Sequence, residues 1–275
     1  MDTADHPEPE SSRSADGTQS IRRAVQVLNV VASNHGIRLT HIAKEVGLHV
    51  ATTRRILMAL VDTGMIQMSG NHSLYSLGPQ TLHLGQCAKD QNVIIQPFRP
   101  RLEEIAKRSG DTVLLSVRSE LNAVCVLRIE GAFPIRTMII DVGSMRPLGA
   151  SAGSLALLSW LPDGEIDKII SLHQHQYPKL GIQAEQVRYL VKRSRKLGYA
   201  LNDGLMLKGI SGIGIPIADA TGQIIAAISI TAISSRLTEP RARELVDMAR
   251  DVCKGIPFWT LPQADELMLK CKHAA

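Results

Sequence analysis

The sequence predicts an α+β protein with two folded domains, a small and mostly helical one followed by a larger one of alternating strands and helices. Its length of 275 residues suits two domains. Apolar residues have helical spacing between residues 20 and 64, and a hairpin pattern follows. Strand-like and helix-like segments then alternate between residues 112 and 254. Aromatic residues make up only 3% of the chain, so both cores are expected to be aliphatic.

The first segment, residues 1–19, is rich in Pro, Ser, Asp and Glu and has no apolar periodicity. This composition predicts a disordered acidic tail. Ser20 can then cap a first helix, which Gly36 can end. The apolar positions of that helix follow helical spacing: Ile21, Ala24, Val25, Leu28, Val31 and Ala32.

Two further helices and a hairpin complete the first domain, residues 20–78. Thr40 can cap a short second helix, and Gly47 permits a sharp turn after it. The third helix places four residues on one packed face: Thr53, Ile56, Leu57 and Leu60. Two short strands, Met65–Gln67 and Ser73–Leu77, flank a Gly-Asn turn. This order of elements is that of a winged helix-turn-helix.

A linker helix is expected over residues 79–96, and the second domain over residues 97–260, with helical character resuming after Pro100. A tight hairpin at Asp219–Gly222 joins the last two strands, and residues 261–275 form a C-terminal tail. The predicted strands are Thr112–Arg118, Ala123–Ile129, Arg136–Ile140, Tyr199–Asn202, Ile213–Ala218 and Ile224–Ala232. The predicted helices are Ser151–Trp160, Glu165–Leu172, Glu185–Leu197 and Arg241–Lys254.

The charge pattern and the third helix together indicate DNA binding. The net charge is +5, and a basic segment follows the acidic tail. A basic small domain is typical of nucleic-acid binding, although a solvated surface would give the same count. Arg55 lies opposite the packed face of the third helix, the element that enters the major groove in a helix-turn-helix. The candidate DNA-binding residues are Arg22, Arg23, Lys44, Ala51, Thr52, Arg54, Arg55, Asn71 and His72.

A ligand site is predicted where two strands of the second domain carry small residues. A tight hairpin would set Gly214 opposite Ala227 and Gly212 opposite Ser229, which leaves one face of the pair small and weakly polar. Glycine in a strand marks close approach by a ligand or by another backbone. A bound ligand and a closely packed helix therefore both remain open.

The helix that begins near Ser151 supplies a second wall, because its first turn offers backbone N–H groups that suit a carboxylate. A plain N-cap by Ser151 is the alternative, and at the end of the Gly-Tyr strand a simple turn is the alternative to polar contacts. The candidate effector-binding residues are Ser151, Ala152, Gly153, Ser154, Asn202, Asp203, Gly212, Gly214, Ser229 and Thr231.

Other chemistries find little support in the sequence. It has no apolar run long enough for a membrane span and no signal peptide, so a cytoplasmic protein without membrane partners is expected. The four cysteines are expected to be reduced thiols, with Cys125 a buried small hydrophobe. On a strand His173 and His175 would share a face, but no third metal ligand lies nearby. There is no phosphate loop, nucleophile elbow or revealing carboxylate pair, so no cofactor, metal or catalytic residue is expected.

Several ordered motifs between Ser20 and Lys254 resemble the IclR family of regulators. The first domain contains LTHIAKEVGLHVATTRRILMALVDTGMIQ, then YSLG ending at Gly78. The second contains PLGASAGSLALLS from Pro147, GYALND from Gly198 and GIGIPIADATGQIIAAISI from Gly212. The chain departs from the family pattern at Ala51, usually a small hydroxyl residue, and at Ser154–Leu155, usually Gly-Lys. It also departs at Gly204–Leu205, where an acidic residue is frequent, and at Gly212, which is frequently Cys.

The resemblance implies a GAF-like effector domain with an antiparallel sheet, and a chain that forms dimers or tetramers. The expected function is sequence-specific, DNA-binding transcription regulation, as repressor or activator, modulated by a small organic acid or aromatic effector. The expected partners are double-stranded operator DNA, the effector and further copies of the chain. Two alternatives remain: an enzyme domain tethered to a DNA- or partner-binding module, and a non-specific architectural DNA-binding protein.

Overall fold

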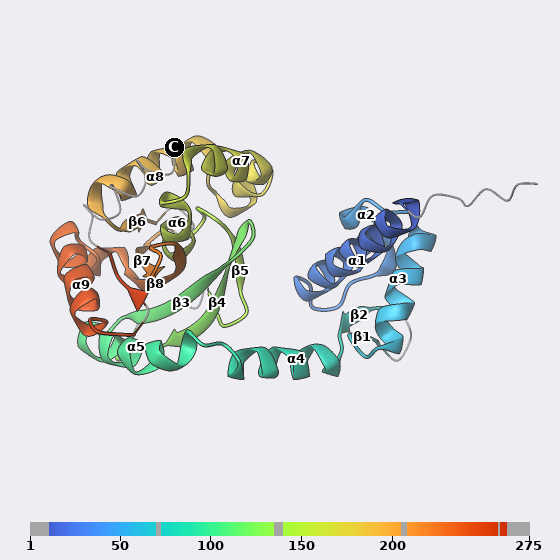
Figure 1. The fold of residues 1–275 in the computed structure, drawn as a ribbon, viewed down its shortest axis with the longest axis horizontal. Coiled ribbons are helices and arrows are strands. Elements are labelled where there is room, and N and C mark those ends of the chain that lie inside the picture. Colours follow the sequence, from blue (N-terminus) through green and yellow to red (C-terminus); the bar gives the residue numbers. More distant parts are fainter. Residues whose placement is uncertain (1–10, 70–72, 135–139, 205–207, 258, 263–275) are drawn as a thin grey trace, which may run out of the picture. The chain divides into compact units, whose positions relative to one another are not determined.

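The computed structural model describes residues 11–69, 73–134, 140–204, 208–257 and 259–262, and it divides into two compact units (Figure 1). The first unit is residues 1–91 and the second is residues 92–275. The boundary falls inside the linker helix expected over residues 79–96, because that helix ends at Asp90. The second unit therefore begins before residue 97, the start that the sequence predicts.

The first unit has the predicted order of three helices, a hairpin and a further helix. The two strands pair antiparallel, with Ile66 opposite Leu77, and Ile37 forms a bridge to Tyr75. The core is aliphatic except for Tyr75 and is built from Val27, Val31, Ile37, Ile42, Leu57, Ile66 and Tyr75. The elements are α1 (Ser11–Ala32), α2 (Leu39–Val46), α3 (Val50–Asp62), β1 (Ile66–Met68), β2 (Tyr75–Leu77) and α4 (Pro79–Asp90).

Helix α1 begins at Ser11, so the prediction of a disordered tail over residues 1–19 is wrong for Ser11–Gln19. Helix nucleation is unfavourable, but adding residues to an existing helix costs little free energy. The apolar stripe after Ser20 stabilises the helix, so the residues before it can extend α1 without an apolar pattern of their own. Ser20 accordingly lies within α1 instead of capping it. Thr40 also lies within a helix, because α2 begins after Arg38, which makes no side-chain cap.

The second unit is built on a seven-stranded antiparallel sheet in the order β5-β4-β3-β8-β7-β6, with β9 paired to β7. Its strands are β3 (Thr112–Ser119), β4 (Asn122–Ile129), β5 (Met145–Pro147), β6 (Ala200–Asp203), β7 (Ile210–Asp219), β8 (Ile224–Ile233) and β9 (Trp259–Thr260). Its helices are α5 (Ile95–Ser109), α6 (Ala152–Ser159), α7 (Asp163–His173), α8 (Ala184–Leu197) and α9 (Glu239–Val252), with short 3₁₀ turns η1 (Tyr177–Leu180) and η2 (Ser234–Arg236).

Three expectations for this unit need correction or fall outside the described chain. Helix α5 begins at Ile95 and runs through Pro100, because its buried Phe98 and Leu102 hold the helix against the sheet although Pro100 cannot donate a backbone hydrogen bond. Residues 135–139 of the strand expected at Arg136–Ile140 lie outside the described residues, and Ile140 is not in a strand. Strands β5 and β9 were missed, because segments of three and two residues carry no periodicity.

Helices cover both faces of the sheet (Figure 1). Helices α5 and α9 pack on one face, against residues such as Ile213 and Ile228. Helices α6, α7 and α8 lie on the other, where the strands contribute Ala200, Ala218 and Ala227. Residues 211–218 of β7 are all buried, as expected for a strand covered on both faces. All eight residues of α6 are buried as well, because this helix lies between the sheet and α8.

Candidate functional site

Helix α3 presents its basic residues on the side away from the core. Thr53 and Leu57 are fully buried, and the Thr53 hydroxyl donates a hydrogen bond to the carbonyl oxygen of His49 at 3.1 Å. Ala51, Arg54 and Arg55 are exposed, and Thr52 is half-buried. The packed face predicted for this helix is therefore the observed one, and both guanidinium groups reach solvent.

The other predicted DNA-binding residues that the structure describes lie on α1 and α2. Arg22 and Lys44 are exposed, and Arg23 is half-exposed. Asn71 and His72 lie outside the described residues. Within the described part of the chain, the five basic candidates form neither an ion pair nor a side-chain hydrogen bond: Arg22, Arg23, Lys44, Arg54 and Arg55. Their charges are therefore available to an anionic partner.

The turn between α2 and α3 fixes how the start of α3 is displayed. Gly47 adopts the left-handed conformation with φ +66°, as the sequence predicted for a sharp turn here. The N–H of Leu48 then donates to the Ala43 carbonyl at 3.0 Å, and α3 begins at Val50. Val50 is 47% exposed although it is an apolar residue in a small domain. Val50 was not among the predicted DNA-binding residues; the available signal was its place in the first turn of α3, one helical turn before Arg54.

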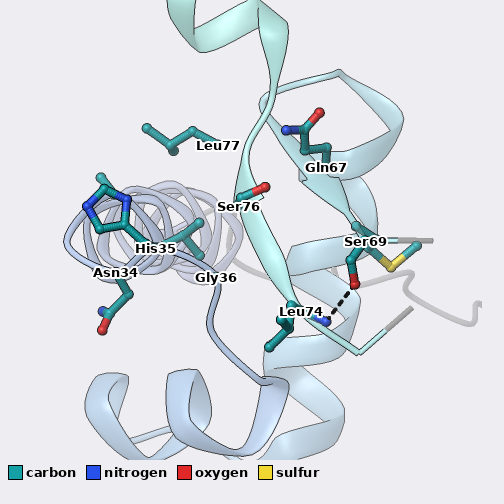
Figure 2. Close-up of a pocket in the computed structure, with 11 residues that line it drawn as sticks. Asn34, His35, Gly36, Gln67, Ser69, Leu74, Ser76 and Leu77 are labelled. Carbon is teal, nitrogen blue, oxygen red and sulfur yellow. Dashed lines mark hydrogen bonds between the residues drawn. The ribbon is translucent and has the colours of Figure 1, made fainter. Parts of the chain in front are cut away.

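A separate hollow lies in the first unit between the loop after α1 and the β1–β2 hairpin (Figure 2). Asn34, His35 and Gly36 line one side, and Gln67 and Ser76 belong to the strands on the other. The Leu74 N–H donates to the Ser69 hydroxyl at its margin, at 3.3 Å. The hollow contains none of the predicted DNA-binding residues, so it is distinct from the outer face of α3.

In the second unit, β7 and β8 pair in a register two residues away from the predicted one. Gly214 lies opposite Ser229 and Gly212 opposite Thr231, with an irregularity between Ile217 and Ala218. The hairpin forms where predicted, but its turn is one residue longer, because the Asp219 N–H donates to the Gln223 carbonyl at 3.0 Å. The Asp219 carboxylate holds this turn by accepting hydrogen bonds from the Thr221 hydroxyl and N–H and from the Gln223 N–H. The bond from the Thr221 hydroxyl is the main reason that the pKa of Asp219 is lowered. The whole offset is two residues, one from the longer turn and one from the irregularity, so the small residues still share one face.

That small face is covered by helix α6, which corrects the expectation of an open ligand surface at Gly214. A Cβ on Gly214 would lie 2.1 Å from the carbonyl oxygen of Ala152, and one on Gly212 would lie 3.1 Å from the Ala152 Cβ. A Cβ on Gly153 would in turn lie 3.3 Å from the Ser229 hydroxyl. The close approach that the glycines signalled is therefore that of a helix, the second of the two alternatives.

The polar groups at the start of α6 are largely bonded to each other. The Ser154 hydroxyl accepts from the Ser151 N–H at 2.7 Å, and the Ser154 N–H reaches the Ser151 hydroxyl at 3.4 Å. The Asn202 amide donates to the Ala150 carbonyl at 3.3 Å, and Asp203 forms an ion pair with Arg193 at 2.8 Å. The structure thus brings Ser151–Ser154, Asn202, Gly212 and Ser229 together, in a packed and mutually satisfied arrangement.

Polar residues that the sequence analysis overlooked extend this face toward β3 and β4. The strand registers place Arg128, Leu114, Ser229 and Gly214 in one row on the α6 side of the sheet. The side chain of Arg128 is only 6% exposed and forms ion pairs with Glu130 at 3.2 Å and Asp141 at 3.8 Å. The signal in the residues was an arginine within an otherwise apolar strand; its burial depends on the fold.

Among the histidines and cysteines considered for other chemistry, His173 and Cys125 are buried. The buried His173 ends α7 and bonds through Nε2 to the Leu121 carbonyl at 2.8 Å, whereas His175 lies in the following turn. The two rings therefore do not share a strand face. Among the described residues no group of three or more His, Cys, Asp or Glu could hold a metal ion. Burial raises the pKa of Cys125 to about 11, as expected of a small buried hydrophobe.

No helix in the described ranges is long and apolar enough to cross a bilayer.

Two family models match the chain, one for each unit. Residues 20–69 match the IclR helix-turn-helix domain, and residues 86–257 match the bacterial transcriptional regulator IclR C-terminal domain. Among curated proteins, the transcriptional repressor IclR of Escherichia coli is 25% identical over 244 residues, which are 86% of this chain and 88% of that protein. The Escherichia coli repressor AllR is 27% identical over 244 residues, which are 87% of this chain and 89% of the repressor.

Solved structures show the same fold. An IclR family regulator from Brucella abortus has a TM-score of 0.75 at 20% identity, covering 93% of this chain and 97% of the other. An IclR homologue from Microbacterium hydrocarbonoxydans, solved in complex with 4-hydroxybenzoate, has a TM-score of 0.63 at 19% identity. It covers 92% of this chain and 99% of the other.

Proposed function

This chain belongs to the IclR family of bacterial transcriptional regulators, which are DNA-binding proteins with an effector-binding C-terminal domain. We propose a separate role for each of its two units. Helix α3 reads a specific operator, and a small organic acid or aromatic compound in the second unit changes the affinity for that operator. The curated relatives are regulators, so the enzyme alternative is not favoured.

The single observation that carries the DNA-reading role is the outer face of α3. Arg55 is exposed opposite the buried Thr53 and Leu57, and Arg54 is exposed on the flank of the helix. Neither has a partner among the described residues. Arginine donates two hydrogen bonds to guanine O6 and N7 in the major groove. Arg22, Arg23 and Lys44 are suited to the phosphate backbone, and the sequence adds Asn71 and His72 as candidates for the same role.

For the effector, the start of α6 and the neighbouring β3–β4 part of the sheet are the favoured location. The buried Arg128 side chain lies on this face, where an effector carboxylate would exchange with its present partners Glu130 and Asp141. The first turn of α6 adds the N–H groups of Ala152 and Gly153, because those of Ser151 and Ser154 are bonded within the capping box. Thr231, Asn202 and Asp203 lie on the adjoining strands. The homologue solved with 4-hydroxybenzoate supports an aromatic acid as the ligand class.

The regulator is proposed to act as a symmetric oligomer through α4. Every residue of this helix is exposed or half-buried within its own unit, and Leu82 and Leu84 are 67% and 46% exposed. A second copy would cover these side chains and set two α3 helices on paired half-sites about one helical turn, or a multiple of it, apart.

The test is selection of duplexes from a random library by the full chain, followed by binding isotherms on the enriched and on random sequence. We expect enrichment of a roughly palindromic site that binds at least a thousandfold tighter than random DNA. A thermal-shift screen with benzoates and short organic acids then identifies the effector class. Equal affinity for all sequences would reject the regulator in favour of a non-specific architectural protein.

A further inference from the structure

Exposed apolar side chains interrupt the basic outer face of α3. Val50 is 47% exposed and Met58 is 37% exposed, and Ala51 is exposed beside Val50. Val50 is absent from the core cluster of the first unit, which uses Leu57 from the same helix. At 100° per residue Val50 lies about 40° from Arg54 and about 20° from Leu57 around the helix, so it stands on the flank of the outer face, next to Arg54. The first turn of α3 therefore offers a methyl-covered surface next to two guanidinium groups.

The major groove presents one apolar group to such a surface, the C5-methyl group of thymine. The residues at the N-terminal end of a groove-reading helix are those that meet base edges. We propose that Val50, with Ala51 beside it, packs against a thymine methyl group and so selects a T·A pair next to the base pair contacted by Arg54. This inference rests on the proposed function, because it requires α3 to lie in the major groove of a specific operator.

The contact gives the operator a mixed character. Arginine donors recognise guanine, whereas Val50 has no donor or acceptor and discriminates only by the presence of a methyl group. The preference would be for thymine over cytosine or uracil at a single position of each half-site. The expected gain is about fourfold in affinity, the equivalent of one methyl group removed from water.

Deoxyuridine isolates this contact, because it removes the C5-methyl group and leaves every hydrogen-bonding group of the base pair in place. Each thymine of the selected operator is replaced in turn, and affinity is measured for the wild type, Val50→Ala and Met58→Ala. The wild type should lose about fourfold at one position in each half-site. Val50→Ala should bind the thymine operator more weakly and lose nothing further at that position. Met58→Ala, one helical turn beyond Arg54, should keep the full deoxyuridine effect there.

Circular dichroism melts accompany each variant, and a cooperative transition near that of the wild type shows that the domain is folded. A wild-type affinity that is indifferent to deoxyuridine at every position would overturn the inference while leaving operator binding intact. An undiminished deoxyuridine effect in Val50→Ala would also overturn it, by assigning the methyl contact to another residue. Failure to enrich any operator would reject the proposed function itself, and this inference with it.

Discussion

A Cβ placed on Gly214 would lie 2.1 Å from the carbonyl oxygen of Ala152, so strand β7 and the first residue of α6 approach each other at a distance that only glycine allows. This contact determines how α6 is seated on the sheet. It also reverses the role expected of Gly214 from the sequence, because the space beside it is occupied by backbone.

We predict that Gly214→Val destabilises the second unit by about 1–3 kcal/mol or more, because the rigid backbone of α6 cannot move aside as a flexible side chain could. Thermal and urea melts measure the change. Gly164→Ala in α7 is the matched control, since a Cβ there meets no atom within 4 Å; it should be neutral or slightly stabilising. A Gly214→Val variant as stable as the wild type would contradict the close packing.

Arg55→Ala should weaken binding to the selected operator by about 1–3 kcal/mol, with a smaller loss on random duplex, if the guanidinium makes a bidentate base contact. Isotherms on both duplexes at one fixed salt concentration measure the difference. Lys254→Ala, an exposed charge in the second unit, controls for net charge. Equal losses on specific and random DNA would reassign Arg55 to phosphate contact.

Replacing Arg128 by Gln should abolish the thermal shift given by carboxylate effectors and retain any shift given by their uncharged amides. The reason is that the buried guanidinium lies in the same row of the sheet as Leu114 and Ser229. Arg118→Gln is the control, because Arg118 is engaged with Glu165 at 2.5 Å toward the other end of β3. A carboxylate shift that survives in Arg128→Gln would place the anion site elsewhere.

Stability should fall as the pH rises above about 9. Burial raises the pKa of Cys125 to about 11 and that of Cys253 to about 12, from an ordinary value of 9.0. Both thiols therefore stay protonated in the folded state while the unfolded chain ionises. The stabilisation is complete below pH 9 and declines by up to about 1.4 kcal/mol per pH unit per thiol toward pH 11. Urea melts of the wild type and Cys253→Ala between pH 8 and 11 measure it, and identical slopes would refute the assignment.

Leu82→Glu should lower the oligomeric order of the full chain, because it places charge on the exposed apolar surface of α4. Light scattering at several micromolar concentrations measures the mass, and loss of cooperative operator binding should accompany dissociation. Lys89→Glu, on the same helix, is the charge control. A wild-type chain that is monomeric both free and on DNA would remove the α4 interface altogether.

Elements with clear periodicity were predictable, and ambiguous or short ones were not. The buried pair Thr53 and Leu57 fixed the face of α3 in advance, and Gly47 its preceding turn. The β7–β8 register differs from the predicted one by two residues, because neither the longer turn after Asp219 nor the irregularity between Ile217 and Ala218 has a signature in the residues themselves. A glycine in a strand indicates that a ligand or another backbone approaches closely, but the sequence does not distinguish between the two. At Gly214 the approaching group is the backbone of helix α6.

Strand β5 and the burial of Arg128 depend on contacts between segments distant along the chain. Local pattern could not supply them. Val50 was missed for the opposite reason: an apolar residue beside a helical core is ordinarily counted with that core, and its exposure depends on how the turn at Gly47 directs the helix.

The complete burial of α6 limits how the second unit can respond to anything that binds at its start. A helix without a solvent face cannot roll about its own axis without unpacking the sheet and α8 together, and a close-packed interior resists such strain. The displacement of α6 that disturbs this packing least is a short translation along the helix axis. The sheet and α8 both contact α6, so both would be displaced by that translation. Helix α6 is therefore the element through which a ligand bound at its start would change the packing elsewhere in the second unit.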